Sequence, residues 1–254
     1  MIASCPPDAG RSGLSVRSAS VAAMSQPSPI ATWHALCLDA SDQPRLAEFW
    51  SAAIDRRPDP VDPTHLVGEA EAAQVWVDAV PEPKTAKNRV HLDVDVGDID
   101  GLLSMGARVL REPDGDISWY IMADPGGGEF CAFVRPDRAS LPGRLYEVVV
   151  DCADPYAQAD WWGELFGLVP EREPKEHFAA LEGGGRLPFD YLCFVPVPEP
   201  KTVKNRVHWD VTVADVALLT ERGARVLREP DDDISWHVMA DPEGNEFCAF
   251  TARP

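Results

Sequence analysis

Strict alternation of apolar and polar residues predicts a β-strand from Arg89 to Val96. One face of this strand carries Val90, Leu92, Val94 and Val96, and the other carries Arg89, His91, Asp93 and Asp95. Successive side chains of a strand point to opposite sides of a sheet, so the apolar face is expected in a core. The polar face, which begins with a histidine, is the side on which chemistry could take place.

Helical spacing replaces alternation over Gln43–Ile54, where Leu46, Phe49, Trp50 and Ala53 share one side and Asp42 is placed as N-cap. A short helix is expected from Asp98 to Gly106, since glycine commonly ends helices. Two further helices are predicted at 155–165 and 215–222. Strands are expected at 32–38, 74–80, 107–111, 119–123, 129–134, 145–150, 191–197, 206–213, 224–228, 236–240 and 246–251. The order strand, helix, several strands recurs, which is typical of an α+β fold built from βαβββ modules.

The chain is a tandem duplication. Val80–Val134 aligns with Val197–Thr251 at an offset of 117 residues, with 16 differences in 55 positions. Upstream the likeness is weaker and the offset is 112, with Leu38–Trp50 against Val150–Trp162. The second copy therefore has about five extra residues, which the Gly-rich stretch at 182–186 can supply. A chain of 254 residues then divides into two domains.

Composition excludes several function classes. A formal net charge of −19 disfavours nucleic acid and anionic membrane surfaces, both of which require a basic face. No run of 18 apolar residues is present, so no transmembrane helix is expected. Six cysteines without a CxxC pair indicate reduced thiols and a cytoplasmic protein. Residues 1–29 lack periodicity and a signal-peptide pattern, and we expect a disordered tail, with Met24 as an alternative start.

The segments HLDVDV, GARVLREP and ADPGGGEFCAF, with HWDVTV, GARVLREP and ADPEGNEFCAF in the second copy, resemble the vicinal oxygen chelate superfamily. The motifs PEPKTxKNRVHxD and DPEGNEFC are similar to its glyoxalase-like branch, and the superfamily also includes bleomycin-resistance proteins. The resemblance implies two tandem glyoxalase/dihydroxybiphenyl-dioxygenase-like domains, 30–136 and 143–252. In each domain, paired βαβββ modules would form a U-shaped cup.

The resemblance also implies where a metal would bind: a histidine in the first strand of each module and a carboxylate in each last strand. Carried over, these positions give His34, Asp78, His91, Glu129 and Cys131 in the first copy, and Tyr146, His208, Glu246 and Cys248 in the second. Cysteine replaces the usual acid in both copies, and tyrosine replaces the first histidine of the second. We therefore expect no cofactor. The candidates for a divalent metal are His34, Asp78 and His91 in the first domain, since two histidines and a carboxylate suit such an ion.

Two other features leave alternatives open. A histidine and a cysteine at cup depth could act as base and nucleophile, although a cysteine within FCAF is more often a small buried apolar residue. The segments PEPKTAKNR and PEPKTVKNR could clamp an anion, or could form rigid proline turns whose basic side chains pair with nearby acids. They lack the Gly-rich loop of a nucleotide site.

The sequence therefore predicts a protein that binds an unknown small molecule in its cups without catalytic metal. The alternative is a metal-dependent lyase or dioxygenase acting in the first domain. No nucleic acid or membrane partner is expected. The two copies could pack on each other, or the chain could pair as a homodimer.

Overall fold

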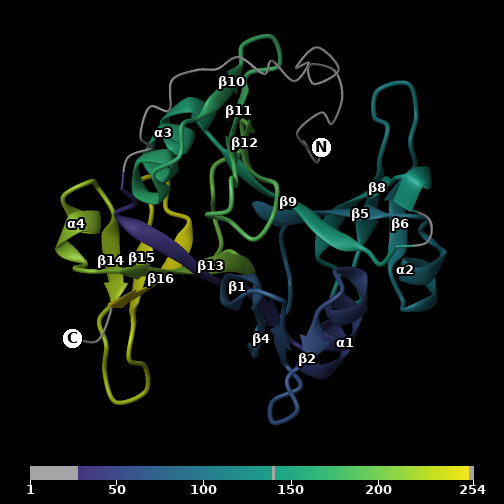
Figure 1. Cartoon of the computed structure of the whole chain (residues 1–254), viewed down its shortest axis with the longest axis horizontal. Coiled ribbons are helices and arrows are strands. Elements are labelled where there is room, and N and C mark those ends of the chain that lie inside the picture. The colour runs from purple at the N-terminus through teal and green to yellow at the C-terminus, as the bar shows by residue number, and fades with distance from the viewer. Residues whose placement is uncertain (1–27, 139–140, 252–254) are drawn as a thin grey trace.

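The computed structural model describes residues 28–138 and 141–251, which form two eight-stranded sheets with four α-helices among these residues. The expectations for the N-terminal tail and for Met24 fall outside this range. The α+β class and the paired βαβββ modules are confirmed. Figure 1 shows both sheets strongly curved, with the hairpins of one pointing up and those of the other pointing down.

The first sheet, called here the β1–β13 sheet, has the strand order β14-β15-β16-β13-β1-β4-β3-β2. Its strands are β14 (Arg225–Arg228), β15 (His237–Ala240), β16 (Glu246–Thr251), β13 (Val207–Val213), β1 (Ala31–Ala40), β4 (Val75–Ala79), β3 (His65–Val67) and β2 (Arg57–Pro58). The second, the β5–β9 sheet, has the order β10-β11-β12-β9-β5-β8-β7-β6. Its strands are β10 (Glu171–Glu173), β11 (Phe178–Glu182), β12 (Tyr191–Pro196), β9 (Arg144–Cys152), β5 (Val90–Val96), β8 (Glu129–Val134), β7 (Tyr120–Ala123) and β6 (Arg108–Arg111).

Each sheet combines one module from each copy. β1 of the first copy pairs antiparallel with β13 of the second, and β5 of the first pairs antiparallel with β9 of the second. We had expected the two modules of one copy to share a cup. The structure corrects this expectation, because both cups are assembled across the duplication.

The short connection between the copies explains this pairing. β8 lies parallel to β5, and the chain resumes at Arg144, directly opposite Asp95 of β5. Asp95 accepts hydrogen bonds from Arg135 at 3.1 Å and from Arg144 at 2.9 Å, one on each side of the connection. A Cβ at Gly143 would overlap the carbonyl oxygen of Ala53, so only glycine fits this close approach to the end of α1. The connection therefore places β9 along the edge of β5 that is not paired with β8.

Two helices begin and end as their sequences predict. α1 (Gln43–Ala53) starts after Asp42, whose side chain accepts from the backbone of Arg45. α3 (Pro155–Phe166) starts after Asp154 and ends at Gly167, which has the left-handed φ of 65°. The other two, α2 (Asp100–Ser104) and α4 (Ala217–Thr220), are shorter than predicted. Among the described residues, no helix is long and apolar enough to cross a membrane.

The main core is shared by both copies. Trp33 of β1 stacks on Trp209 of β13, with ring centroids 5.7 Å apart, and Trp209 contacts Trp162 of α3 at 4.8 Å. Phe189, in the loop that follows the Gly-rich insertion, packs edge-on against Trp33 at 4.9 Å. All four aromatic rings are buried. Burying a large aromatic side chain contributes a few kcal/mol, so much of each copy's stability depends on the other copy.

A fragment of residues 28–138 tests this dependence, because it keeps β1 and β5 but loses both of their antiparallel partners. We expect the fragment to form a homodimer in which β1 of one chain pairs with β5 of the other, since unpaired central strands are strongly disfavoured. Light scattering after size-exclusion chromatography measures the mass. A stable monomer with native-like circular dichroism would contradict the proposed dependence.

Candidate functional site

The polar face of each central strand is the chemically distinctive surface of its sheet. On β13, Val207, Trp209 and Val211 enter the core, while His208 and Asp210 point to the opposite face. On β5, the corresponding residues are His91 and Asp93. That opposite face forms the interior of each cup.

In the β1–β13 cup, four donor side chains converge. Cys37, His208 and Asp210 offer ligand atoms that all lie within 4.8 Å of one another. The Sγ of Cys248 lies 3.8 Å from Nε2 of His208. Strand register places them together, since Cys37 is opposite His208 and Asp210 is opposite Cys248. These residues are called the sulfur cluster below.

Burial governs the protonation of this cluster. It lowers the pKa of His208 to about 4, so the imidazole is neutral at pH 7. Burial raises the pKa of Asp210 to about 7, although hydrogen bonds from Cys37 and Cys248 oppose that rise. It also raises the pKa of both thiols, with the Asp210 charge as the next cause. Without a bound ion, both thiols are therefore protonated at neutral pH.

The β5–β9 cup has a related group formed by His91, Asp93 and Cys131, which also lie within 4.8 Å of one another. His91 Nε2 is 3.3 Å from Asp93 Oδ1, and within the described part of the chain neither ring nitrogen makes a hydrogen bond. Burial, followed by the Asp93 charge, raises the pKa of the Cys131 thiol. Opposite His91 this sheet has Val149, at the register position that Cys37 occupies opposite His208, so it lacks the fourth member of the sulfur cluster.

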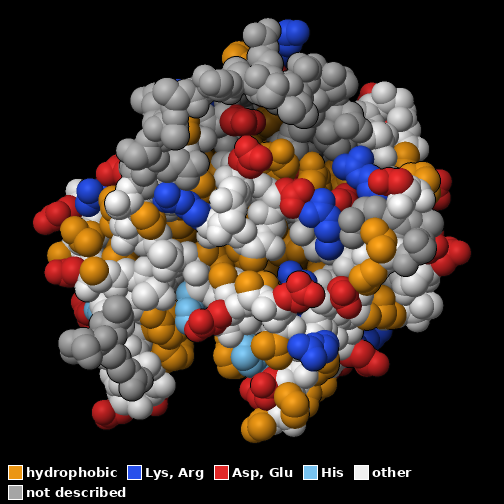
Figure 2. All heavy atoms as spheres, viewed as in Figure 1, with side chains coloured by type: hydrophobic (Ala, Val, Ile, Leu, Met, Phe, Trp, Pro, Cys, Tyr) orange, Lys and Arg blue, Asp and Glu red, His pale blue; other side chains and the backbone are white. Residues whose placement is uncertain are grey.

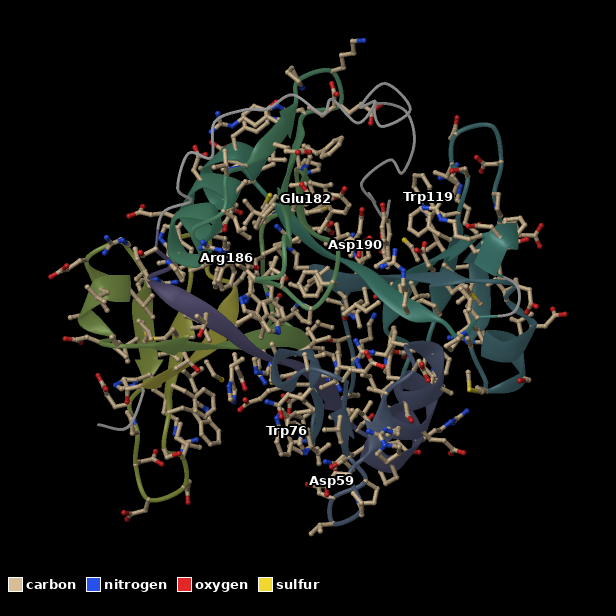
Figure 3. The ribbon with its side chains drawn as sticks, in the orientation of Figure 1. Asp59, Trp76, Trp119, Glu182, Arg186 and Asp190 are labelled. Atoms are coloured by element: carbon tan, nitrogen blue, oxygen red, sulfur yellow. The ribbon has the colours of Figure 1, made fainter. Side chains whose placement is uncertain are left out.

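The walls of the cups differ as well. In the β1–β13 cup, His65 stacks on Trp76 with ring centroids 3.8 Å apart, and Trp236 stacks on Phe250 at 5.3 Å. All four side chains are partly exposed. Figure 2 shows the molecule hollowed between the lobes that carry these walls, with histidine side chains beside the hollow. The labelled Trp76 lies on the side of β4 that faces the hollow (Figure 3).

The β5–β9 cup is instead lined by the apolar cluster around Trp119, Phe133 and Tyr146. Trp119 contacts Phe133 at 5.5 Å, and Phe133 contacts Tyr146 at 6.0 Å. Figure 3 places Trp119 on the inner side of its arm, facing the lobe that carries Glu182 and Asp190. One wall of this cup is therefore an apolar aromatic cluster, with the guanidinium groups of Arg135 and Arg144 over the Tyr146 ring.

The structure separates the three metal candidates predicted from the sequence. His34 and Asp78 lie in the β1–β13 sheet, whereas His91 lies in the β5–β9 sheet. The expected set of two histidines and a carboxylate therefore does not assemble, because the first strands pair across the copies. His34 instead packs against Phe250, with ring centroids 5.1 Å apart. Asp78 is an exposed residue, and burial of part of its side chain, followed by the Asp39 charge, raises its pKa.

The other predicted site residues are divided between the two cups. His208 and Cys248 meet in one cup, and His91, Cys131 and Tyr146 line the other.

Glu129 and Glu246 hold the proline-rich loops in place. Glu129 accepts hydrogen bonds from Lys84 at 2.8 Å and from the backbone of Asn88 at 3.1 Å. Glu246 makes the same two contacts with Lys201 and Asn205. The lysines of these loops therefore pair with nearby acids, as one of the two interpretations of the loops expected.

Sequence reasoning missed Cys37, Asp93 and Asp210 as site residues. A signal for two of them was present, because His-x-Asp recurs at 91–93 and 208–210 and places both side chains on one strand face. Cys37 gave no such signal, since it enters the cluster through a strand pairing that joins the two copies.

A metal is implied by the family resemblance, and the sulfur cluster fits one. Two sulfurs, one imidazole and one carboxylate form a donor set that suits Zn²⁺ and related ions. Nδ1 of His208 and Oδ1 of Asp210 are buried without hydrogen bonds to other described residues, as expected for groups with an unfilled coordinating or orienting role. The set differs from the histidine and carboxylate ligands that the resemblance implied.

Comparison with known proteins agrees with this architecture. A family model described as the glyoxalase-like domain matches residues 35–133 and 147–250, so the chain belongs to the glyoxalase-like domain family. A search of curated proteins finds no match.

Two solved structures of glyoxalase I show the same fold over most of the chain. Glyoxalase I from Zea mays is 15% identical, with a TM-score of 0.56, and the match covers 86% of this chain and 92% of that one. A mutant of the same enzyme is 16% identical, with a TM-score of 0.56 and coverage of 87% and 94%. A glyoxalase/bleomycin resistance protein/dioxygenase family enzyme from Burkholderia phytofirmans is 18% identical, with a TM-score of 0.32, covering 42% of this chain and 97% of its own. The tandem glyoxalase-like fold of the vicinal oxygen chelate superfamily is confirmed.

Thiol reactivity tests the protonation described above. Because Cys37, Cys131, Cys152, Cys193 and Cys248 are buried, we expect iodoacetamide at pH 7.5 to leave them unmodified in the native protein and to modify them in denaturant. Mass spectrometry of a Cys5→Ser variant reports these five alone. Rapid native alkylation of Cys248 would favour the nucleophile hypothesis instead.

Proposed function

We propose that the protein binds a small organic molecule in the β1–β13 cup and that binding needs no catalytic metal. The observation that carries this proposal is the pair of partly exposed aromatic walls, His65–Trp76 and Trp236–Phe250, on either side of a polar floor. Ligand pockets commonly combine apolar walls with a few placed polar groups.

The floor defines the polar end of the ligand. Neutral His208 and the protonated thiols offer hydrogen bonds without a full positive charge. The charge of Asp78, which acts on Cys37 and Asp210 of the floor, disfavours an anionic group there. The ligand class that fits is a planar, largely apolar molecule with an uncharged hydroxyl or carbonyl directed at the floor.

Ligand screening with matched tryptophan variants tests this proposal. In a thermal-shift panel of planar phenols and aromatic ketones, we expect binders whose affinity falls roughly three- to tenfold in Trp76→Ala and Trp236→Ala, since each variant removes aromatic contact. Trp119→Ala is the control, because Trp119 lines the other cup. Equal losses in all three variants, or loss only in the control, would place binding elsewhere.

A second candidate function is metal-dependent lyase or dioxygenase chemistry, favoured by the convergence of the sulfur cluster. Three of the side chains Cys37, His208, Asp210 and Cys248 would hold the ion, and the position left open would let it act as a Lewis acid toward a bound carbonyl or hydroxyl oxygen. The aromatic walls would orient the substrate above it. Asp78, whose pKa burial raises, is then the nearby group suited to moving a proton.

Metal analysis separates the two candidates. If the sulfur cluster binds an ion, mass-spectrometric metal analysis of untagged protein incubated with Zn²⁺ or Co²⁺ should show about one equivalent lost in His208→Ala. His34→Ala is the matched control, because His34 lies in the same cup but outside the cluster. Co²⁺-loaded protein should also absorb as a thiolate complex. Metal content unchanged by His208→Ala would exclude this candidate and leave the metal-free proposal.

A further inference from the structure

The two proline-rich loops, residues 81–89 and 198–206, meet each other and enclose a cavity of about 240 Å³. Each loop is held by an arginine of the other copy. Arg89 Nη1 donates to the carbonyl oxygen of Glu199 at 2.6 Å, and Arg206 Nη1 donates to that of Glu82 at 3.0 Å. The cavity therefore lies at the junction of the two copies and outside both cups.

Basic side chains dominate the lining of this cavity in an otherwise acidic protein. The lining includes the cationic residues Lys84, Lys87, Arg89, Lys204 and Arg206, against the acidic residues Asp39 and Glu82. With a net charge of −19 over the whole chain, this local excess of cations calls for a physical reason.

The lysines of the cavity are already neutralised by carboxylates. Lys84 pairs with Glu129, Lys87 with Asp151, and Lys204 with Asp39. These pairs bind the loops to residues near the ends of β1, β8 and β9, and they leave none of these three lysine charges without a partner.

The two arginines differ from the lysines. Over residues 28–138 and 141–251, neither Arg89 nor Arg206 forms an ion pair, and their hydrogen bonds go to neutral carbonyl oxygens. Nε of Arg89 is buried and has no hydrogen-bond partner in the described chain. A guanidinium group carries five N–H donors arranged to bind carboxylate or phosphate in a bidentate manner, so these two lack the partner that their geometry favours.

We propose that this cavity binds a compact dianion, a phosphate group or a small dicarboxylate, between Arg89 and Arg206. The two uncompensated positive charges match a charge of −2. A volume of about 240 Å³ is below the roughly 300–1,000 Å³ of typical small-molecule pockets, which limits the occupant to a small ion or metabolite. The prolines fix the loop backbone and the carbonyl contacts hold both arginines, so little ordering is needed on binding.

Equilibrium dialysis of the full-length protein with radiolabelled inorganic phosphate tests the proposal at constant ionic strength set by chloride. We expect one phosphate per chain, displaced by malonate, with the dissociation constant raised at least about tenfold in the double variant Arg89→Gln, Arg206→Gln. Glutamine keeps a donor for the loop carbonyls. The double variant Arg111→Gln, Arg228→Gln is the charge-matched control, because Arg111 and Arg228 pair with Asp114 and Asp231 on the exposed surface.

Competition identifies the source of the dianion. Displacement by malonate supports a site for any compact dianion, and failure of malonate to displace phosphate supports a phosphate-specific site. Dialysis runs well below the melting temperature, and circular dichroism verifies that each variant is folded. Absence of phosphate and malonate binding to the wild type, or unchanged affinity in the folded double variant, would overturn the proposal.

Discussion

The antiparallel pairing of β1 with β13, and of β5 with β9, is the constraint on which the rest of this structure depends. Each pairing joins one copy to the other at the centre of a sheet. The rings of Trp33 on β1 and Trp209 on β13 stack on each other in the core beside the first pairing. Both cups, the shared core and the junction of the proline-rich loops follow from it. The duplication therefore produced one interdependent unit, since neither copy completes a sheet alone.

The two cups differ although each combines one module from each copy. Cys37 faces His208, whereas its register equivalent Val149 faces His91. The β1–β13 cup therefore has a fourth donor and partly exposed aromatic walls, whereas the β5–β9 cup has three donors beside an aromatic cluster. Burying polar groups without partners is destabilising, so the presence of both groups favours a role beyond packing.

Local patterns predicted most of the fold. Alternation located β5, and the cap residue Asp42 located the start of α1. Pairing between strands could not be predicted in this way, because near-identical modules offer the same edges to partners within a copy and between copies. Because the strands pair between the copies, His34 and His91 lie in different sheets. The same pairing places Cys37 in the sulfur cluster. Asp95 accepts hydrogen bonds from Arg135 and Arg144, the arginines on either side of the connection between the copies, and these contacts favour the pairing of β5 with β9. A comparison of the two repeats does not reveal these contacts.

The proline-rich loops are nearly identical in the two copies, whereas the cups differ, and each observation has its own physical reason. The loops repeat PEPKTxKNR almost unchanged because each must supply a lysine to the other copy's β1 or β9 and an arginine to the other loop. A change in one loop would remove contacts on both sides of the junction. The cups have no such reciprocal requirement, since they lie on opposite sides of the molecule (Figure 1). The symmetric loops therefore hold together a protein whose binding surfaces are free to become unequal.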